Sequence, residues 1–159
     1  MSKVIKEILL VFIFSTLLST AYAQYKDQVR VYHGYEWPSE TWFYGINFTG
    51  EFFPINYFSI APSFTLFVPS TGNARAYDIN ARYYFTEKER QWYGTFGYGH
   101  YTRVYEFNPI GRISTNSVNI GGGGVFKIND EIGINPEIRY QPIQRNEMIF
   151  KISILYFVN

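Results

Sequence analysis

The chain has 159 residues, enough for one domain, and its 14 basic and 13 acidic residues give a net charge of +1. This near neutrality argues against nucleic acid as a partner, and the absence of cysteine excludes a disulfide scaffold and a thiolate metal site. Aromatic residues make up 21% of the chain but charged residues only 17%, below the roughly 25% usual in soluble domains. The composition indicates that something other than water covers much of the surface.

The first 23 residues, MSKVIKEILLVFIFSTLLSTAYA, have the pattern of a secretory signal peptide. Two lysines precede an apolar run over residues 8–18, and the motif A-Y-A at 21–23 precedes Gln24. The apolar run is too short to span a membrane. We therefore expect cleavage after residue 23 and a mature domain of residues 24–159. Cleavage removes two lysines and one glutamate, so 12 basic and 12 acidic residues remain.

Apolar and polar side chains alternate along the rest of the chain, and no helical period competes with this pattern. Strands turn successive side chains to opposite faces, so each alternating segment predicts a strand. The connectors hold most of the Pro, Asn and exposed charge, which is typical of turns and indicates an antiparallel meander. We place about eight strands, to within about two to four residues, at 27–36, 41–53, 57–68, 75–86, 91–106, 115–128, 131–141 and 147–158.

The segment RAYDINARYYF, residues 75–85, shows the two faces: Tyr77 and Ile79 lie on one, Asp78 and Asn80 on the other. Across the strands, the polar face carries small residues and a few charges of both signs. A water-facing sheet would carry many long Lys and Glu side chains. We therefore predict an all-β fold, a closed antiparallel up-and-down transmembrane β-barrel whose apolar face contacts lipid. The alternatives are a soluble sandwich and a lipocalin-like periplasmic ligand-binding barrel.

Charged side chains on the polar face need partners, because an unpaired charge removed from water costs several kcal/mol or more. An eight-stranded barrel is about wide enough for side chains to fill. We therefore favour a plug of ion pairs over a gated polar path, which would make the protein a small porin. The expected polar network in the lumen comprises Glu51, Asp78, Arg82, Arg103, Glu137, Arg139 and Lys151.

Aromatic side chains should form two belts at headgroup depth if the mature chain starts on the periplasmic side. The outer belt would contain Trp37, Trp42, Tyr44, Phe67, Tyr77, Tyr105 and Tyr140. The inner belt would contain Phe52, Phe53, Phe58, Phe85, Trp92, Tyr93 and Phe126.

The last strand contains KISILYFV, the most specific motif of the mature chain. By this ending and by its overall pattern, the chain resembles the small eight-stranded outer-membrane barrels. This class includes OmpX, the membrane domain of OmpA, and the short outer membrane beta-barrel proteins of Bacteroidetes. Family members end in a recognition signal for the barrel-assembly machinery, so the resemblance implies that Lys151, Ser153, Tyr156 and Val158 form such a signal. Ser153 stands where the family has Gly, and Asn159 follows where it ends on an aromatic residue.

His100 and Thr102 share one face of a predicted strand, and their spacing resembles the His-x-Ser of eight-stranded lipid A deacylases. A hydroxyl nucleophile needs a base, and the base needs an orienting group within hydrogen-bond reach. Glu106 is about 20 Å from His100 along a strand, and the neighbouring strands offer no carboxylate on that face. We therefore expect no hydrolysis of lipid A, and a lipid A acyl hydrolase remains the alternative.

These patterns predict a small non-enzymatic protein of the cell outer membrane, either structural or an accessory subunit of a complex. The expected partners are outer-membrane lipid, the barrel-assembly machinery during biogenesis, and other outer-membrane proteins. We expect no cofactor. His33 and Glu36 are two possible metal ligands, too few to make a site.

Overall fold

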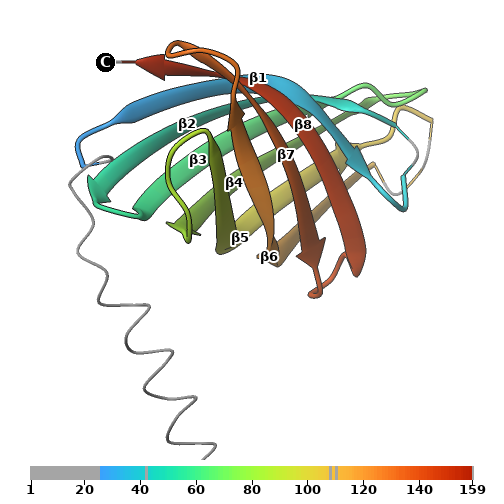
Figure 1. The fold of residues 1–159 in the computed structure, drawn as a ribbon. Coiled ribbons are helices and arrows are strands. Elements are labelled where there is room, and N and C mark those ends of the chain that lie inside the picture. Colours follow the sequence, from blue (N-terminus) through green and yellow to red (C-terminus); the bar gives the residue numbers. More distant parts are fainter. Residues whose placement is uncertain (1–25, 42, 108, 110, 159) are drawn as a thin grey trace, which may run out of the picture.

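The computed structural model describes residues 26–158 except 42, 108 and 110. Eight strands follow one another around a closed antiparallel barrel in which β1 also pairs with β8 (Figure 1). The predicted all-β barrel is confirmed, while the predicted signal peptide lies outside the described residues. No helix in the described part of the chain is long and apolar enough to cross a membrane. The strands are β1 (Val29–Pro38), β2 (Gly45–Ile55), β3 (Phe58–Phe67), β4 (Asn73–Tyr84), β5 (Arg90–Val104), β6 (Arg112–Lys127), β7 (Ile132–Gln141) and β8 (Glu147–Val158).

The connections are shorter on average at one end of the barrel than at the other, although 85–89 is as long as 68–72 and 142–146. Those at the end where β1 starts and β8 finishes cover residues 56–57, 85–89 and 128–131, and those at the other end cover 39–44, 68–72, 105–111 and 142–146. Outer-membrane barrels have short periplasmic turns and longer extracellular loops. The loop lengths therefore agree with a periplasmic β1 start, and we call the opposite end the outer end.

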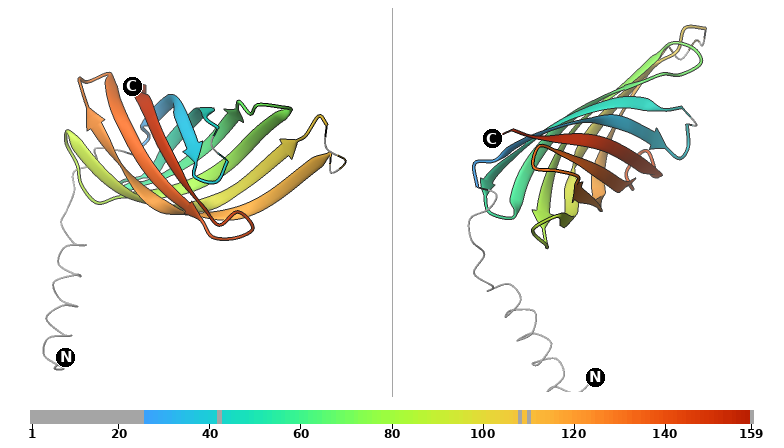
Figure 2. Two further views of the ribbon diagram at one scale, coloured as in Figure 1. Left: turned by 90° about the vertical axis from the view of Figure 1, so that its right-hand side faces the viewer. Right: turned by 45° about the horizontal axis from the view of Figure 1, so that its top comes forward.

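The β5–β6 hairpin projects past the rest of the barrel at the outer end (Figure 2). Its strands have 15 and 16 residues, more than any other. Pairing between β5 and β6 continues to Val104 and Arg112, whereas pairing between β6 and β7 stops at Ile120 and Tyr140. On the β7 side, the last part of this hairpin therefore extends past its neighbour, whereas β4 stays paired with β5 up to Asn73 and Val104.

The apolar face of the strands lies on the outside, as expected from the alternation. Ile79 is 55% exposed and its neighbour Asn80 only 3%. The same alternation runs without a break along β1 and β8. Large apolar side chains thus cover the outer wall, and polar side chains fill the interior.

The interior is layered along the barrel axis. An apolar cluster at the periplasmic end contains Tyr32, Phe53, Tyr84, Tyr93, Val125, Leu155 and Phe157. A second cluster at the outer end contains Phe67, Ala74, Ala76 and Tyr101, with Phe43 packed against it. Most of the buried charged side chains lie between these two plugs, but Arg30 packs against rings of the periplasmic cluster, and the Arg145–Glu147 ion pair lies beside Tyr101 of the outer one.

This layering corrects part of the belt prediction. Phe53, Tyr93 and Phe67 were expected at the lipid interfaces, but they are at most 5% exposed inside the barrel. Each occupies an inward-facing position of its strand, so its side chain points into the lumen whatever its height along the barrel axis. Trp42 of the expected outer belt lies outside the described residues.

Candidate functional site

Arg139 is the centre of the charged layer and contacts three carboxylates. Its Nη2 lies 2.7 Å from Glu36 Oε2, its Nη1 3.3 Å from Asp78 Oδ2, and its Nε 3.1 Å from Glu137 Oε1. These partners come from β1, β4 and β7. One guanidinium therefore ties together distant parts of the barrel wall.

Arg82 makes a second centre closer to the periplasmic end. Its Nη2 lies 2.5 Å from Glu137 Oε2, and its Nη1 lies 3.4 Å from Glu51 Oε1. The guanidinium also sits over the rings of Tyr93 and Tyr32, 4.6 Å and 5.2 Å from their centroids. Glu137 contacts both this arginine and Arg139, so the two centres form one continuous network.

Glu51 accepts hydrogen bonds from three hydroxyl groups. Ser59 Oγ lies 2.5 Å and Tyr84 Oη 2.8 Å from its carboxylate, and Tyr32 also donates to it. The guanidinium of Arg30 lies 4.0 Å from the same carboxylate and over the ring of Phe53, 4.6 Å from its centroid. The periplasmic plug is therefore joined to the charged layer through Glu51 and Arg30.

The charges of this layer balance. All eight side chains are at most 5% exposed. Polar neutral groups complete the network: Lys151 Nζ donates to Thr49 Oγ1 at 2.8 Å, and Asn119 Nδ2 donates to Asp78 Oδ1 at 2.9 Å. The cations are Arg30, Arg82, Arg139 and Lys151, and the anions are Glu36, Glu51, Asp78 and Glu137.

The structure brings six of the seven expected lumen residues into this interior, but not Arg103. Its Nη2 donates to the backbone oxygen of Thr71 at 3.0 Å, and its guanidinium lies over the Phe43 ring. Asp78 pairs with Gly99, so Arg103 is four residues, about 13 Å, further out along β5. The parity of Arg103 indicated an inward position, but its level along the barrel places it above the charged layer.

Sequence reasoning missed Arg30 and Glu36, which are completely buried in the interior. The sequence pattern could have identified them, because both lie on the polar face of the first predicted strand. Glu36 was weighed instead as a metal ligand beside His33. The two side chains lie on opposite faces of β1: the His33 ring stacks on Tyr156 on the outer wall, with centroids 5.7 Å apart.

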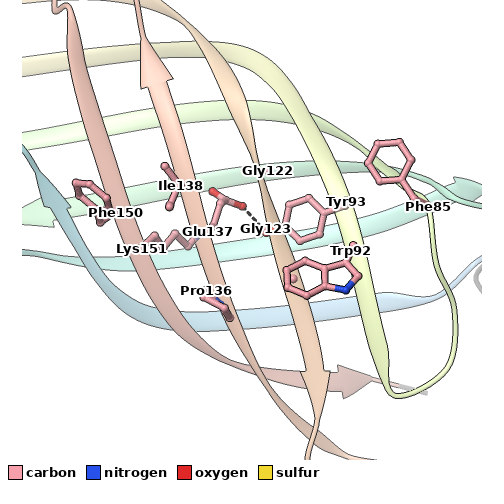
Figure 3. Close-up of a pocket in the computed structure, with 11 residues that line it drawn as sticks. Phe85, Trp92, Tyr93, Gly122, Gly123, Pro136, Glu137, Ile138, Phe150 and Lys151 are labelled. Carbon is pink, nitrogen blue, oxygen red and sulfur yellow. Dashed lines mark hydrogen bonds between the residues drawn. The ribbon is translucent and has the colours of Figure 1, made fainter.

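The lipid-facing wall has a hollow of about 570 Å³ over β5, β6 and β7 (Figure 3). Gly122 and Gly124 contribute no side chain to the wall there, and the hollow is bordered by Trp92, Ile138 and other apolar groups. Pro136 of β7 has no N–H for the ladder, and the Asn135 side chain donates to the Gly124 carbonyl at 2.9 Å instead. The hollow has an apolar rim and fits an apolar chain.

The four residues of the expected assembly signal divide between the two faces of β8. Lys151 and Ser153 point into the barrel, whereas Tyr156 and Val158 are 40% and 49% exposed on the wall. Ser153 faces Gly34 on β1, where an added Cβ would lie only 2.5 Å from the Ser153 Cα. The glycine that allows close approach here is thus on the partner strand.

His100 and Thr102 belong to a hydrogen-bonded chain on the outward face of the β5–β6 hairpin. The His100 Nδ1–H donates to Asn116 Oδ1 at 2.6 Å, and the Thr102 hydroxyl donates to His100 Nε2 at 3.3 Å. Thr102 Oγ1 also lies 3.3 Å from Ser114 Oγ. Sequence reasoning looked for a carboxylate and missed the amide that orients the imidazole.

No protein-family model and no curated protein sequence matches the chain. The N-terminal β-barrel domain of Pseudomonas aeruginosa OprF matches with a TM-score of 0.72 at 15% identity, over 85% of this chain and 100% of that one. Ail, the attachment invasion locus protein of Yersinia pestis, matches with a TM-score of 0.59 at 16% identity, over 83% and 98%.

The chain has the fold of the small eight-stranded outer-membrane barrels. A de novo designed transmembrane β-barrel matches this barrel as well, with a TM-score of 0.63 at 10% identity over 86% of this chain and 100% of the design. Because a designed sequence shares the fold, the fold of this outer-membrane barrel does not fix an activity. Its function has to be argued from its own side chains.

Proposed function

We propose that the protein is a lumen-filled, non-enzymatic barrel of the outer membrane with a structural or accessory role. The observation that carries this proposal is the charge-balanced interior between two aromatic plugs. Its ion pairs connect strands that are two and three places apart around the ring. A layer of this kind holds the wall together and leaves no continuous polar path for a solute.

The dimensions of the lumen support a closed barrel over a porin. At the outer end, the crevice beside Asp78, Tyr101 and Gln141 is too narrow to admit a water molecule. The periplasmic end is filled by large rings, among them Tyr84 and Tyr93, which pack with centroids 5.1 Å apart. Among the described residues, side chains thus occupy space at both ends of the barrel, which supports a closed lumen.

The outer wall supports placement in a lipid bilayer. Large apolar side chains such as Phe48 and Phe96, 51% and 62% exposed, have no protein partner among the described residues that covers them. We further propose that residues 1–23 direct export and that Lys151, Ser153, Tyr156 and Val158 are read by the barrel-assembly machinery. Other outer-membrane proteins would dock on the wall or the short loops.

A lipid acyl hydrolase remains the second candidate because the Asn116–His100–Thr102 chain has the order of orienter, base and nucleophile. Against it, Thr102 is only 3% exposed, so its hydroxyl meets no substrate without a rearrangement. The non-enzymatic role is therefore the one we propose. Mass spectrometry of lipid A from cells with and without the protein separates the two: loss of an acyl chain that depends on His100 would establish the hydrolase.

Membrane fractionation and gel mobility test the main proposal. We expect the protein in the outer-membrane fraction, with a change in electrophoretic mobility on heating as the barrel unfolds. Co-purification from native membranes in mild detergent then identifies any complex. Recovery as a soluble monomer without detergent would refute the membrane placement.

A further inference from the structure

The outward face of the barrel changes from apolar to polar near the outer end of β4, β5 and β6. Below the change, Ile79, Tyr98 and Val118 pair side by side across the three strands. Above it lie six side chains that we call the rim patch: Arg75, His100, Thr102, Arg112, Ser114 and Asn116. The patch lies where the wall would leave the hydrocarbon and enter the headgroup region.

The centre of the rim patch is held in place by its own hydrogen bonds. Asn116, His100, Thr102 and Ser114 form the chain described above, with all contacts between 2.6 and 3.3 Å. The Asn116 backbone N–H also donates to Gln144 Oε1 at 2.9 Å, which ties the patch to the β7–β8 loop. These groups form a fixed polar surface rather than a set of mobile side chains.

The two arginines at the edges of the patch are exposed and take part in no salt bridge among the described residues. Arg75 pairs with Thr102, and Thr102 pairs with Ser114. Arg112 lies two residues further out on β6, so the two arginine Cα atoms are about 12 Å apart. Both guanidinium groups can therefore reach one anion placed between them. The interior charges, by contrast, are balanced.

We propose that the rim patch binds the phosphate of an outer-leaflet lipid headgroup. Arg75 and Arg112 supply charge-assisted hydrogen bonds to the phosphate oxygens, and exposed Ser114 supplies a hydroxyl between them. The acyl chains lie along Ile79 and Tyr98 directly below. This apolar wall is the reason to assign a lipid rather than a soluble phosphate. The inference rests on the proposed membrane placement.

The test compares two lipids that differ only in the phosphate. Purified protein in dodecyl maltoside micelles, which carry no phosphate, is mixed with either phosphatidic acid or diacylglycerol of the same acyl chains, and bound lipid is counted by native mass spectrometry. We expect retention of phosphatidic acid and not of diacylglycerol. The double variant Arg75→Gln, Arg112→Gln should lower that retention about tenfold or more.

Arg90 provides the matched control, because it is an exposed arginine at the opposite end of β5. Arg90→Gln should retain phosphatidic acid as the unchanged protein does, and the change in gel mobility on heating shows that each variant is folded. Equal retention of the two lipids would overturn the inference, as would an equal loss in Arg90→Gln. Displacement of phosphatidic acid by millimolar inorganic phosphate would also overturn it in favour of a soluble anion. If the protein lies in the outer membrane but shows no preference for phosphate, only this inference is wrong. If the protein is soluble, the proposed function is wrong.

Discussion

Replacing Arg139 by methionine should strongly destabilise the barrel. The substitution keeps a long side chain but leaves Glu36, Asp78 and Glu137 without the cation that lies within 3.3 Å of each. Removing one partner from a buried ion pair costs about 3–5 kcal/mol, because the remaining charge stays out of water. The loss corresponds to about 10²–10⁴-fold in the folding equilibrium.

Reversible urea unfolding in lipid vesicles, followed by tryptophan fluorescence, measures this loss. Arg90→Met is the control, and it should change the free energy of unfolding by no more than about 0.5 kcal/mol because Arg90 is exposed. Adding Glu36→Gln to Arg139→Met should recover part of the stability, since it removes one of the stranded charges. A loss in Arg139→Met no larger than that in Arg90→Met would refute the reasoning that the interior charges hold the barrel together.

The remaining predictions concern the wall, the strand contacts, the lumen and the rim. Ile79→Arg should lower stability in the membrane by roughly 2–4 kcal/mol if the site lies near the bilayer midplane, whereas Asn80→Ala should be mild; equal losses in vesicle unfolding would contradict this assignment of the two faces. Gly97→Ala should impair folding, because a Cβ there would lie 2.3 Å from the Ile79 backbone oxygen, whereas Gly50→Ala has open space and should be neutral in the same assay. Planar-bilayer recordings should show no stable conductance, and large reproducible openings would favour a porin. Lipid A should keep all its acyl chains in cells with the protein, and a loss absent from a His100→Ala strain would contradict this.

The two-residue period predicted the barrel because a strand in a membrane wall must separate lipid-facing from interior side chains at every step. The same period placed Ile79 outside and Asp78 inside, as the structure confirms. Turn chemistry located the connections to within a few residues. These properties are local, so they can be read from neighbouring positions in the chain.

The height of a side chain along the barrel axis cannot be read from neighbouring positions in the chain, since it depends on how each strand is shifted against its neighbours. Arg103 has the parity of an interior residue, but the register of β5 against β4 places it above the charged layer. Phe67 and Phe53 were assigned by level alone, although their parity turns them inward. Asn116 became visible as the partner of His100 only when the β5–β6 register was known.

Accessibility of single cysteines along residues 77–83 tests whether the apolar face of β4 contacts lipid and its polar face fills the lumen, because the chain contains no cysteine of its own. Each cysteine would carry a spin label in the reconstituted protein, and collisions with oxygen and with a water-soluble nickel complex would be measured. We expect high oxygen accessibility at 77, 79, 81 and 83 and low accessibility to both reagents at 80, where the replaced side chain is uncharged. High accessibility to the nickel complex at 79 and 81, the odd positions below the rim patch, would contradict a wall facing lipid, and high accessibility at 80 would contradict a filled lumen.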